Sequence, residues 1–243
     1  MRYLIDFSYA GTNFNGYQKQ PHLRTVQGEI EKVLKMIEQK DVNICSSGRT
    51  DAKVNALHQM AHFDLEKNIS AYKLKGALNG YLPDDIYVND VKIVDSNFHA
   101  RYLVKSKTYV YYINTGVYNP IFRNNMYQYC KTLDYDKMAY SIKDFIGTYD
   151  FSTFCSLEDK RDNKTRTIFD AYIKKDDNII MIVFKGSGFL KYQVRNMVGL
   201  LIEIGSGKVK EDSIPLLIRE KDRTKIGTTA PAQGLTLEKV SYI

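Results

Sequence analysis

Hydrophobic and polar residues in the first half of the chain repeat with two periods, and each period predicts one kind of element. Alternation predicts strands, whereas apolar residues three and four positions apart predict the buried face of a helix. Thr25 and Ser70 precede the two helical patterns as N-cap residues, and Pro83 ends the second. The predicted elements, in chain order, are a strand at 2–9, a helix from Thr25 to Ile37, strands at 42–46 and 57–64, a helix from Ser70 to Tyr81 and a strand at 86–94. This β-α-β-β-α-β order is the ferredoxin-like pattern.

The second half of the chain repeats this mixture of elements at greater length. A hairpin is predicted around Asp176, Asp177 and Asn178, and Gly205 or Gly207 is expected to close a strongly apolar helix. The predicted elements are strands at 107–114, 167–175, 178–185 and 235–243 and helices at 135–146, 189–205 and 211–220. The pattern therefore predicts an α+β protein with two subdomains, residues 1–103 and 104–243, whose sheets either join edge to edge or pack side by side.

Composition supports a globular protein. The 243 residues are 44% hydrophobic and 26% charged, and no apolar run approaches the roughly 20 residues that a membrane span needs. The opening MRYLIDFSYA alternates and contains Asp6, which favours a strand over a signal peptide. Cys45, Cys130 and Cys155 form no CxxC pair, so a zinc site or disulfide framework is not expected, and a reducing cytoplasm is favoured.

The net charge of +7 favours a polyanionic partner, because phosphate binding releases counterions. The 19 tyrosines and 11 phenylalanines add candidates for stacking on unpaired bases. Several familiar sites are absent from the sequence. GSGFLK (186–191) lacks the third glycine of a dinucleotide loop, GSGK (205–208) is not a P-loop, and no GxSxG is present. His58 and His62 have no third ligand nearby in sequence, so structural or RNA-facing histidines are expected rather than a metal site.

Asp51 and Arg195 are the charged residues whose surroundings suggest chemistry. Asp51 follows a short strand and Gly48 on a loop, where a carboxylate can act as nucleophile or general base. Arg195 lies in the apolar helix, so it is either on an exposed edge or buried with a partner. A half-buried carboxylate needs a cation to stay ionised. The residues alone leave a turn aspartate and a surface arginine as open alternatives.

Eight segments occur in the order found in one enzyme family. They are YAGTNFNGYQKQ (9–20) with TVQGEIEKVL (25–34), SGRTDA (47–52), ALNGYLPDDIYV (77–88), FHARY (98–102), KTYVYYI (107–113), FIGTYDFSTF (145–154), GFLKYQVRNMVGLLIEIGSGK (188–208) and APAQGLTL (230–237). Through them nearly the whole chain resembles the TruA family of tRNA pseudouridine synthases.

The resemblance implies a fold and a reaction. The fold is two ferredoxin-like subdomains that share an extended, mainly antiparallel sheet with a central basic cleft. The reaction converts uridine to pseudouridine in the anticodon stem-loop of tRNA, at positions 38–40, with no metal and no organic cofactor. The N-glycosidic bond breaks, the uracil turns, and C5 bonds to C1′ of the ribose. A homodimer in which one RNA touches both subunits is also implied, with no membrane partner.

The resemblance also assigns residues. Asp51 matches the essential aspartate, which either attacks C1′ or C6 or removes the 2′ proton of the ribose. Arg195 matches its partner cation, Tyr109 matches the tyrosine that stacks on the flipped uracil, and Arg49 matches an arginine that contacts RNA. Thr50 is expected to orient the loop. Further candidate RNA contacts, each of which could equally be a solvated surface group, are Lys19, Gln20, Arg24, His58, Arg101, Lys105 and Lys107.

Three positions depart from the family pattern. Lys53 stands where the family has glycine, Asn55 where it has histidine, and Lys107 where it has arginine. If the glycine adopts a positive φ, Lys53 must adopt it too or the loop differs. Lys53 adds a phosphate-seeking charge and Asn55 removes a titratable ring, so both join the candidate RNA-binding residues. Two alternatives follow: a paralogue that modifies ribosomal RNA or another tRNA arm, and a non-catalytic RNA-binding or folding module.

Overall fold

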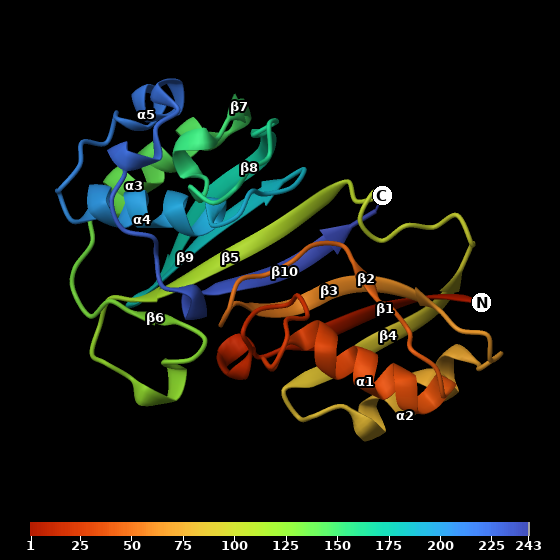
Figure 1. Ribbon diagram of the computed structural model, residues 1–243. Helices are drawn as coiled ribbons and strands as arrows, with labels where there is room; N and C mark the ends of the chain where they lie inside the picture. The colour runs from red at the N-terminus through yellow and green to blue at the C-terminus, as the bar shows by residue number, and fades with distance from the viewer. Residues whose placement is uncertain (243) are drawn as a thin grey trace. The chain divides into compact units, whose positions relative to one another are not determined.

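The computed structural model describes residues 1–242, which divide into two compact units (Figure 1). Unit 1 contains Met1–Lys105 and the stretch from Leu237 onward, and unit 2 contains Ser106–Thr236. No helix among the described residues is long and apolar enough to cross a membrane. Unit 2 is thus inserted, in sequence, before the last strand of unit 1.

The sheet of unit 1 has the strand order of a ferredoxin-like domain. β1 (Arg2–Tyr9) lies between β3 (Asn55–Asp64) and β4 (Ile86–Val94) and is antiparallel to both. β2 (Cys45–Ser46) pairs with β3 on the edge opposite β1, with Cys45 opposite His62. Leu237 onward in β10 (Leu235–Ser241) lies on β3 as well.

The two helices of unit 1 begin where the sequence predicts them. α1 (Val26–Glu38) is capped by the Thr25 hydroxyl, which accepts a hydrogen bond from the Gly28 amide at 3.2 Å, and α2 (Ala71–Tyr81) is capped by Ser70. Figure 1 shows both helices beside the sheet. The core consists of fully buried side chains from the helices and from β1, namely Ile30, Leu34, Leu74, Leu78, Tyr3, Ile5 and Phe7. Each contributes about 1.5–3 kcal/mol by leaving water.

Most strands of unit 2 pair antiparallel to one another, and one short strand pairs in parallel. The strands run β5 (Ser106–Asn114), β9 (Ile179–Gly186), β8 (Thr165–Asp176) and β7 (Gly147–Asp150) across the sheet, and β6 (Tyr127–Gln128) pairs with β5. The predicted β8–β9 hairpin is confirmed, and Asp177 makes its turn with φ 48°. The helices are α3 (Tyr135–Ser141), α4 (Gln193–Gly205) and α5 (Ile214–Glu220).

Several predicted boundaries differ from the structure. α4 begins at Gln193 rather than at 189, because Tyr192 adopts a left-handed φ of 65° and the GFLK residues before it form a loop. The helix predicted at 135–146 is α-helical only to Ser141 and continues as a 3-10 turn to Phe145. β2 is two residues long instead of five. The predicted α+β class is confirmed; a shared sheet and a basic cleft remain predictions.

Candidate active site

Asp51 lies in unit 1 on a loop between β2 and β3, the Asp51 loop (Ser47–Val54). The residues after β1 hold this loop through its backbone. The Tyr17 amide donates to the Thr50 carbonyl at 3.1 Å, and the Lys53 amide donates to the Phe14 carbonyl at 3.4 Å. The Val54 amide closes the turn onto the Asp51 carbonyl at 3.2 Å. Asp51 itself is half-buried.

Buried polar side chains of β1 and β3 form hydrogen bonds with the Asp51 loop. The Thr50 hydroxyl lies 2.8 Å from the Tyr9 hydroxyl, and burial raises the pKa of Tyr9 to about 12, so this phenol keeps its proton. Gln59, fully buried in β3, accepts from the Ser47 hydroxyl at 2.6 Å and donates to the Gly48 carbonyl at 3.2 Å. These contacts fix the loop on both sides of Arg49, whose side chain is exposed.

Lys53 takes the left-handed conformation that its position requires, with φ 67°. The conditional prediction for this residue is therefore confirmed, and the loop keeps its turn after Asp51 although a lysine replaces glycine. The left-handed conformation costs an L-residue roughly 1–2 kcal/mol. The Lys53 side chain is exposed, so its charge remains available to a ligand.

Asn55 has a structural role that the sequence does not reveal. Its side chain is 8% exposed, and its Oδ1 accepts a hydrogen bond from the Gly11 amide at 2.8 Å. Gly11 must be glycine here, because a Cβ would lie 2.2 Å from the Val54 carbonyl oxygen. Asn55 therefore ties the start of β3 to the turn after β1. Its burial favours this supporting role over a direct contact with RNA.

Tyr109 and Arg195 belong to unit 2. Tyr109 lies on β5 opposite Phe184 of β9, and the residue is 8% exposed. The Phe189 ring meets it edge to face, with centroids 5.2 Å apart, which fixes the plane of the tyrosine. Phe189 belongs to the loop that replaces the first predicted turn of α4, so the late start of this helix provides the contact.

Arg195 stands in the first turn of α4 and is held by the segment Ile226–Pro231, the 226–231 segment. Its Nε donates to the Ala230 carbonyl at 2.8 Å, and its own carbonyl accepts from the Ala230 amide at 3.1 Å. The Arg195 guanidinium also lies 5.0 Å from the centroid of the Tyr192 ring. Arg195 is half-buried, and these contacts hold its side chain in place.

The 226–231 segment is itself anchored by buried groups. Asn196 is 1% exposed; its Oδ1 accepts from the Thr229 hydroxyl at 2.6 Å and from Arg223 at 3.3 Å, while its amide donates to the Phe154 carbonyl at 2.8 Å. The Tyr111 hydroxyl of β5 donates to the Pro231 carbonyl at 2.8 Å. Gly199 leaves room for this segment, since a Cβ there would lie 2.0 Å from the Thr228 carbonyl oxygen.

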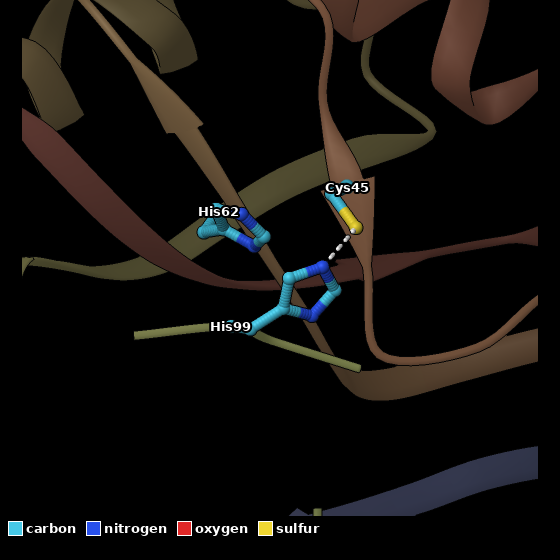
Figure 2. A group of neighbouring side chains, drawn as sticks. All are labelled: Cys45, His62 and His99. Carbon is cyan, nitrogen blue, oxygen red and sulfur yellow. Dashed lines mark hydrogen bonds between the residues drawn. The ribbon is translucent and has the colours of Figure 1, made fainter. Parts of the chain in front are cut away.

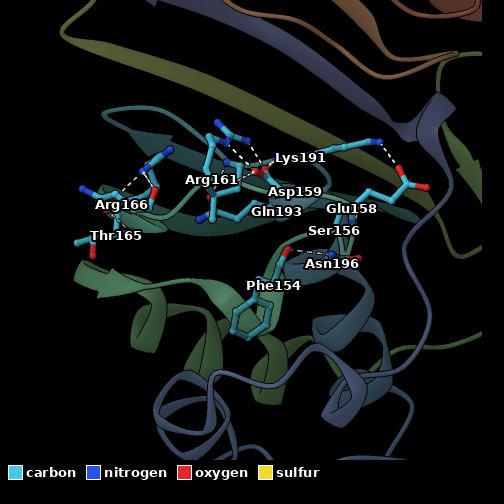
Figure 3. A network of polar contacts seen from close by, with 12 residues as sticks. Phe154, Ser156, Glu158, Asp159, Arg161, Thr165, Arg166, Lys191, Gln193 and Asn196 are labelled. Atoms are coloured by element: carbon cyan, nitrogen blue, oxygen red, sulfur yellow. Dashed lines mark hydrogen bonds and ion pairs between the residues drawn. The ribbon is translucent and has the colours of Figure 1, made fainter.

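A charged network packs on the residues just before α4 (Figure 3). Asp159 accepts hydrogen bonds from Arg161, whose guanidinium holds the pKa of this carboxyl well below its usual range. The Lys191 amide donates to Asp159 at 3.4 Å, and the Ser156 amide donates to the Lys191 carbonyl at 3.0 Å. This network fixes the loop at 156–161 against the residues that lead into α4.

The candidate RNA contacts divide by whether their charge is already paired. Arg24 forms ion pairs with Asp85 at 2.7 Å and Glu29 at 3.1 Å, Lys19 pairs with Glu31, and His58 lies 2.9 Å from Asp6. Gln20 donates to the Asn15 carbonyl at 2.9 Å. Among residues 1–242, Arg49 and Arg101 form no ion pair and both are exposed. Lys105 is exposed too, whereas Lys107 is half-buried on β5.

Cys45, His62 and His99 gather in unit 1 with ligand atoms within 4.8 Å of one another (Figure 2). Their hydrogen bonds argue against metal binding. His62 Nδ1 accepts from the Ala100 amide at 3.1 Å, and His99 Nδ1 accepts from the Arg101 amide at 3.2 Å. A neutral ring that accepts at Nδ1 carries its proton on Nε2, and His99 Nε2 faces Cys45 Sγ at 3.7 Å. A metal on Nε2 would have to displace that proton, so these histidines form a structural cluster.

Comparisons with known proteins identify chains that are similar to this one over nearly its whole length. The chain matches the family model described as tRNA pseudouridine synthase over residues 7–103 and 141–243. It is 44% identical to tRNA pseudouridine synthase A of Staphylococcus carnosus (strain TM300) over 99% of this chain and 90% of that one. The same enzyme of Caldicellulosiruptor saccharolyticus is 44% identical over 98% of each chain, and that of Geobacillus sp. (strain WCH70) is 44% identical over 97% and 96%.

This chain therefore belongs to the tRNA pseudouridine synthase family, and the resemblance read from its sequence is confirmed. The family is a class of isomerases. Sequence reasoning found the reactive candidates but missed their supports, above all Asn196, Gly199 and the Ala230 carbonyl. The NMVG and APAQG stretches were visible in the sequence, although nothing in them shows that they meet.

Proposed function

We propose that this protein isomerises uridine to pseudouridine in the anticodon stem-loop of tRNA, at positions 38–40. Asp51 performs the first chemical step, Arg195 is its partner cation and Tyr109 stacks on the uracil. The observation that carries the proposal is the Asp51 loop, which keeps its left-handed turn at Lys53 and is fixed by Thr50 and Gln59. A carboxylate held in a rigid loop suits a reaction that requires one fixed geometry.

The reaction leaves the composition of the nucleotide unchanged. The bond between N1 and C1′ breaks, the released uracil turns, and C5 bonds to C1′. The proton on C5 then leaves, and N1 regains a proton. Asp51 can begin this sequence by attack at C1′ or C6 or by removing the 2′ proton, and all three routes need the ionised carboxylate.

The unpaired cations support binding of RNA. A base inside a stem-loop must leave its stack before Asp51 can reach it, at a cost of a few kcal/mol. Arg49 is exposed two residues before Asp51 and forms no ion pair among the described residues, so it can offset part of this cost through a phosphate. The net charge of +7 acts in the same direction over longer distances. We also propose a homodimer that works in a reducing cytoplasm, where Cys45, Cys130 and Cys155 stay thiols.

Release of tritium from tRNA labelled at uracil C5 tests the proposal. Asp51→Asn should reduce the rate by about 10²-fold or more, because the variant has lost its carboxylate. Asp84→Asn, at an exposed loop position of the same unit, is the matched control and should keep the wild-type rate. Absence of release from every RNA offered to the wild-type protein would sink the proposal.

A target outside the anticodon stem-loop is the second candidate, and Lys53 is the observation that favours it. Its exposed charge lies two residues after Asp51 and can select a different RNA backbone. Transcripts in which the anticodon arm or another arm is replaced separate the two candidates. Release that follows the anticodon arm supports the first, and release that follows another arm supports the second.

A further inference from the structure

The turn between β4 and β5, Ser96–Tyr102, ends in an exposed aromatic ring and is called the Tyr102 turn here. We propose that Tyr102, backed by His99, is a stacking site for an unpaired base of the RNA substrate, with Arg49 and Arg101 positioned for the neighbouring phosphates. The inference rests on the proposed function, since it names a contact that the RNA makes with unit 1.

The Tyr102 turn is rigid because buried groups anchor its backbone. Arg2 donates to the Ser96 carbonyl and, at 2.9 Å, to the Phe98 carbonyl. Ala100, which is fully buried, donates to His62 at 3.1 Å and accepts from the Tyr242 hydroxyl at 2.8 Å. The backbone that carries Tyr102 is therefore ordered before any ligand arrives.

The Tyr102 ring continues a stack of aromatic rings that starts inside the protein. The His62 ring meets the His99 ring edge to face at 4.8 Å, and His99 stacks on Tyr102 with centroids 4.1 Å apart and planes inclined by 26°. His99 cannot turn freely, because its Nδ1 accepts from the amides of Arg101 and Tyr102 and its Nε2 faces Cys45. The side chain of His99 thus supports one face of the tyrosine.

Most of Tyr102 remains in water, with 77% of the residue exposed. An exposed tyrosine ordinarily loses side-chain entropy when it binds a ligand, whereas a ring already stacked on His99 loses little. Every nucleobase has a face that can stack on such a ring, so a fixed and uncovered aromatic surface suits unpaired RNA.

The charges around the Tyr102 turn favour RNA over an apolar partner. Arg101 belongs to the turn itself, and Arg2 donates to its Ser96 and Phe98 carbonyls. Burial raises the pKa of the Cys45 thiol, and the positive charges of Arg101, Arg2 and Arg49 act against that rise. Arg2 is paired with Asp64, but Arg49 and Arg101 form no ion pair among residues 1–242. An exposed aromatic ring in a region that carries such guanidinium groups combines the features that proteins use to bind single-stranded nucleic acid.

The test replaces the ring and measures binding apart from turnover. In an Asp51→Asn background, Tyr102→Leu should weaken the affinity for an anticodon stem-loop RNA by about 5- to 150-fold, whereas Tyr102→Phe keeps it. Tyr72→Leu, at another highly exposed tyrosine of unit 1, is the matched control and should change nothing. With Asp51 intact, Tyr102→Leu should raise KM and keep kcat at saturating RNA.

A spectroscopic readout separates stacking from a general effect on the fold. RNAs carrying 2-aminopurine at each unpaired position in turn should show quenching at one position with the wild type and Tyr102→Phe, and none there with Tyr102→Leu. Arg101→Gln should instead flatten the salt dependence of binding by about one unit of slope. If Tyr102→Leu keeps the affinity and the quenching while the wild type is active, the stacking site is overturned but the proposed function is not. Loss of affinity that follows a change in oligomeric state assigns Tyr102 to a protein interface and overturns the stacking site too.

Discussion

Gly199→Ala tests whether the 226–231 segment is what positions Arg195. The added Cβ would lie 2.0 Å from the Thr228 carbonyl oxygen, whereas ordinary contacts begin at 3.4 Å, so the segment must move by about 1.4 Å. Ala230 stands two residues further on and holds Arg195 by hydrogen bonds of 2.8 and 3.1 Å. A shift of that size breaks at least one of them.

The expected loss is in turnover. A misplacement of about 1 Å costs roughly 10²-fold in rate, so kcat should fall by about that factor while the affinity for tRNA stays the same. Overpacking costs about 1–3 kcal/mol, and the better helix propensity of alanine returns up to about 1 kcal/mol. The melting temperature should therefore fall by only a few degrees.

Single-turnover release of tritium from C5-labelled tRNA measures the effect. Gly80→Ala is the matched control, because a Cβ on Gly80 in α2 meets nothing within 4 Å. This control should keep full activity and be equally stable or slightly more stable. A Gly199→Ala enzyme that is folded and turns over at the wild-type rate would refute the idea that the 226–231 segment positions Arg195.

Four further substitutions test a left-handed residue, a buried hydrogen bond, an ion pair and the proposed stacking tyrosine. Lys53→Gly removes the strain of a lysine in the left-handed conformation, but it also makes the unfolded chain more flexible. Thermal melting should therefore show equal stability or a gain of up to about 1 kcal/mol. A clear loss of stability would contradict the idea that Lys53 is strained. Asn55→Leu leaves a buried amide unsatisfied and should cost about 1–3 kcal/mol in denaturant titrations. Arg24→Gln removes the guanidinium that lowers the pKa of Asp85. A carboxyl group whose pKa is lowered in the folded state stabilises the fold above about pH 4, and this stabilisation is lost as the pH falls through the pKa of the folded state. The difference in stability between wild type and variant should therefore be full at pH 7 and shrink below about pH 4. A difference that does not depend on pH argues against the Arg24–Asp85 ion pair. Tyr109→Phe should bind tRNA normally and turn over more slowly, and full activity would show that the hydroxyl is dispensable.

The sequence predicted local elements well wherever one residue sets the boundary. Thr25 and Ser70 cap α1 and α2 as expected, because an N-cap acts within three residues of itself. The predicted start of α4 was wrong, because Tyr192 adopts a left-handed φ. Tyrosine disfavours this conformation, and only the surroundings of the residue impose it. The pattern of apolar residues across 189–192 looks helical and gives no sign of this.

The same distinction between local and tertiary causes applies to the candidate site. Asp51 and Lys53 could be placed from the motif, and the positive φ of Lys53 follows from a glycine position. The partner of Asn55 could not be predicted, because Gly11 is 44 residues away. Gly199 and Thr228 meet only in the folded unit, where a missing Cβ and a carbonyl oxygen occupy one space. Contacts of this kind depend on tertiary packing, which a single sequence does not display.

The position of β10 in the sequence has a consequence for synthesis on the ribosome. Residues 106–236 are translated between the body of unit 1 and its remaining strand. Tyr242, which anchors the Tyr102 turn, and the strand beside β3 thus emerge only after all of unit 2 has been made. A nascent chain can complete the core of unit 2 first, whereas the Tyr102 turn and the open side of β3 must wait for codons beyond 236. Translation that stalls in α5 should therefore yield a protease-sensitive unit 1, so competence to bind RNA arises late in the life of the nascent chain.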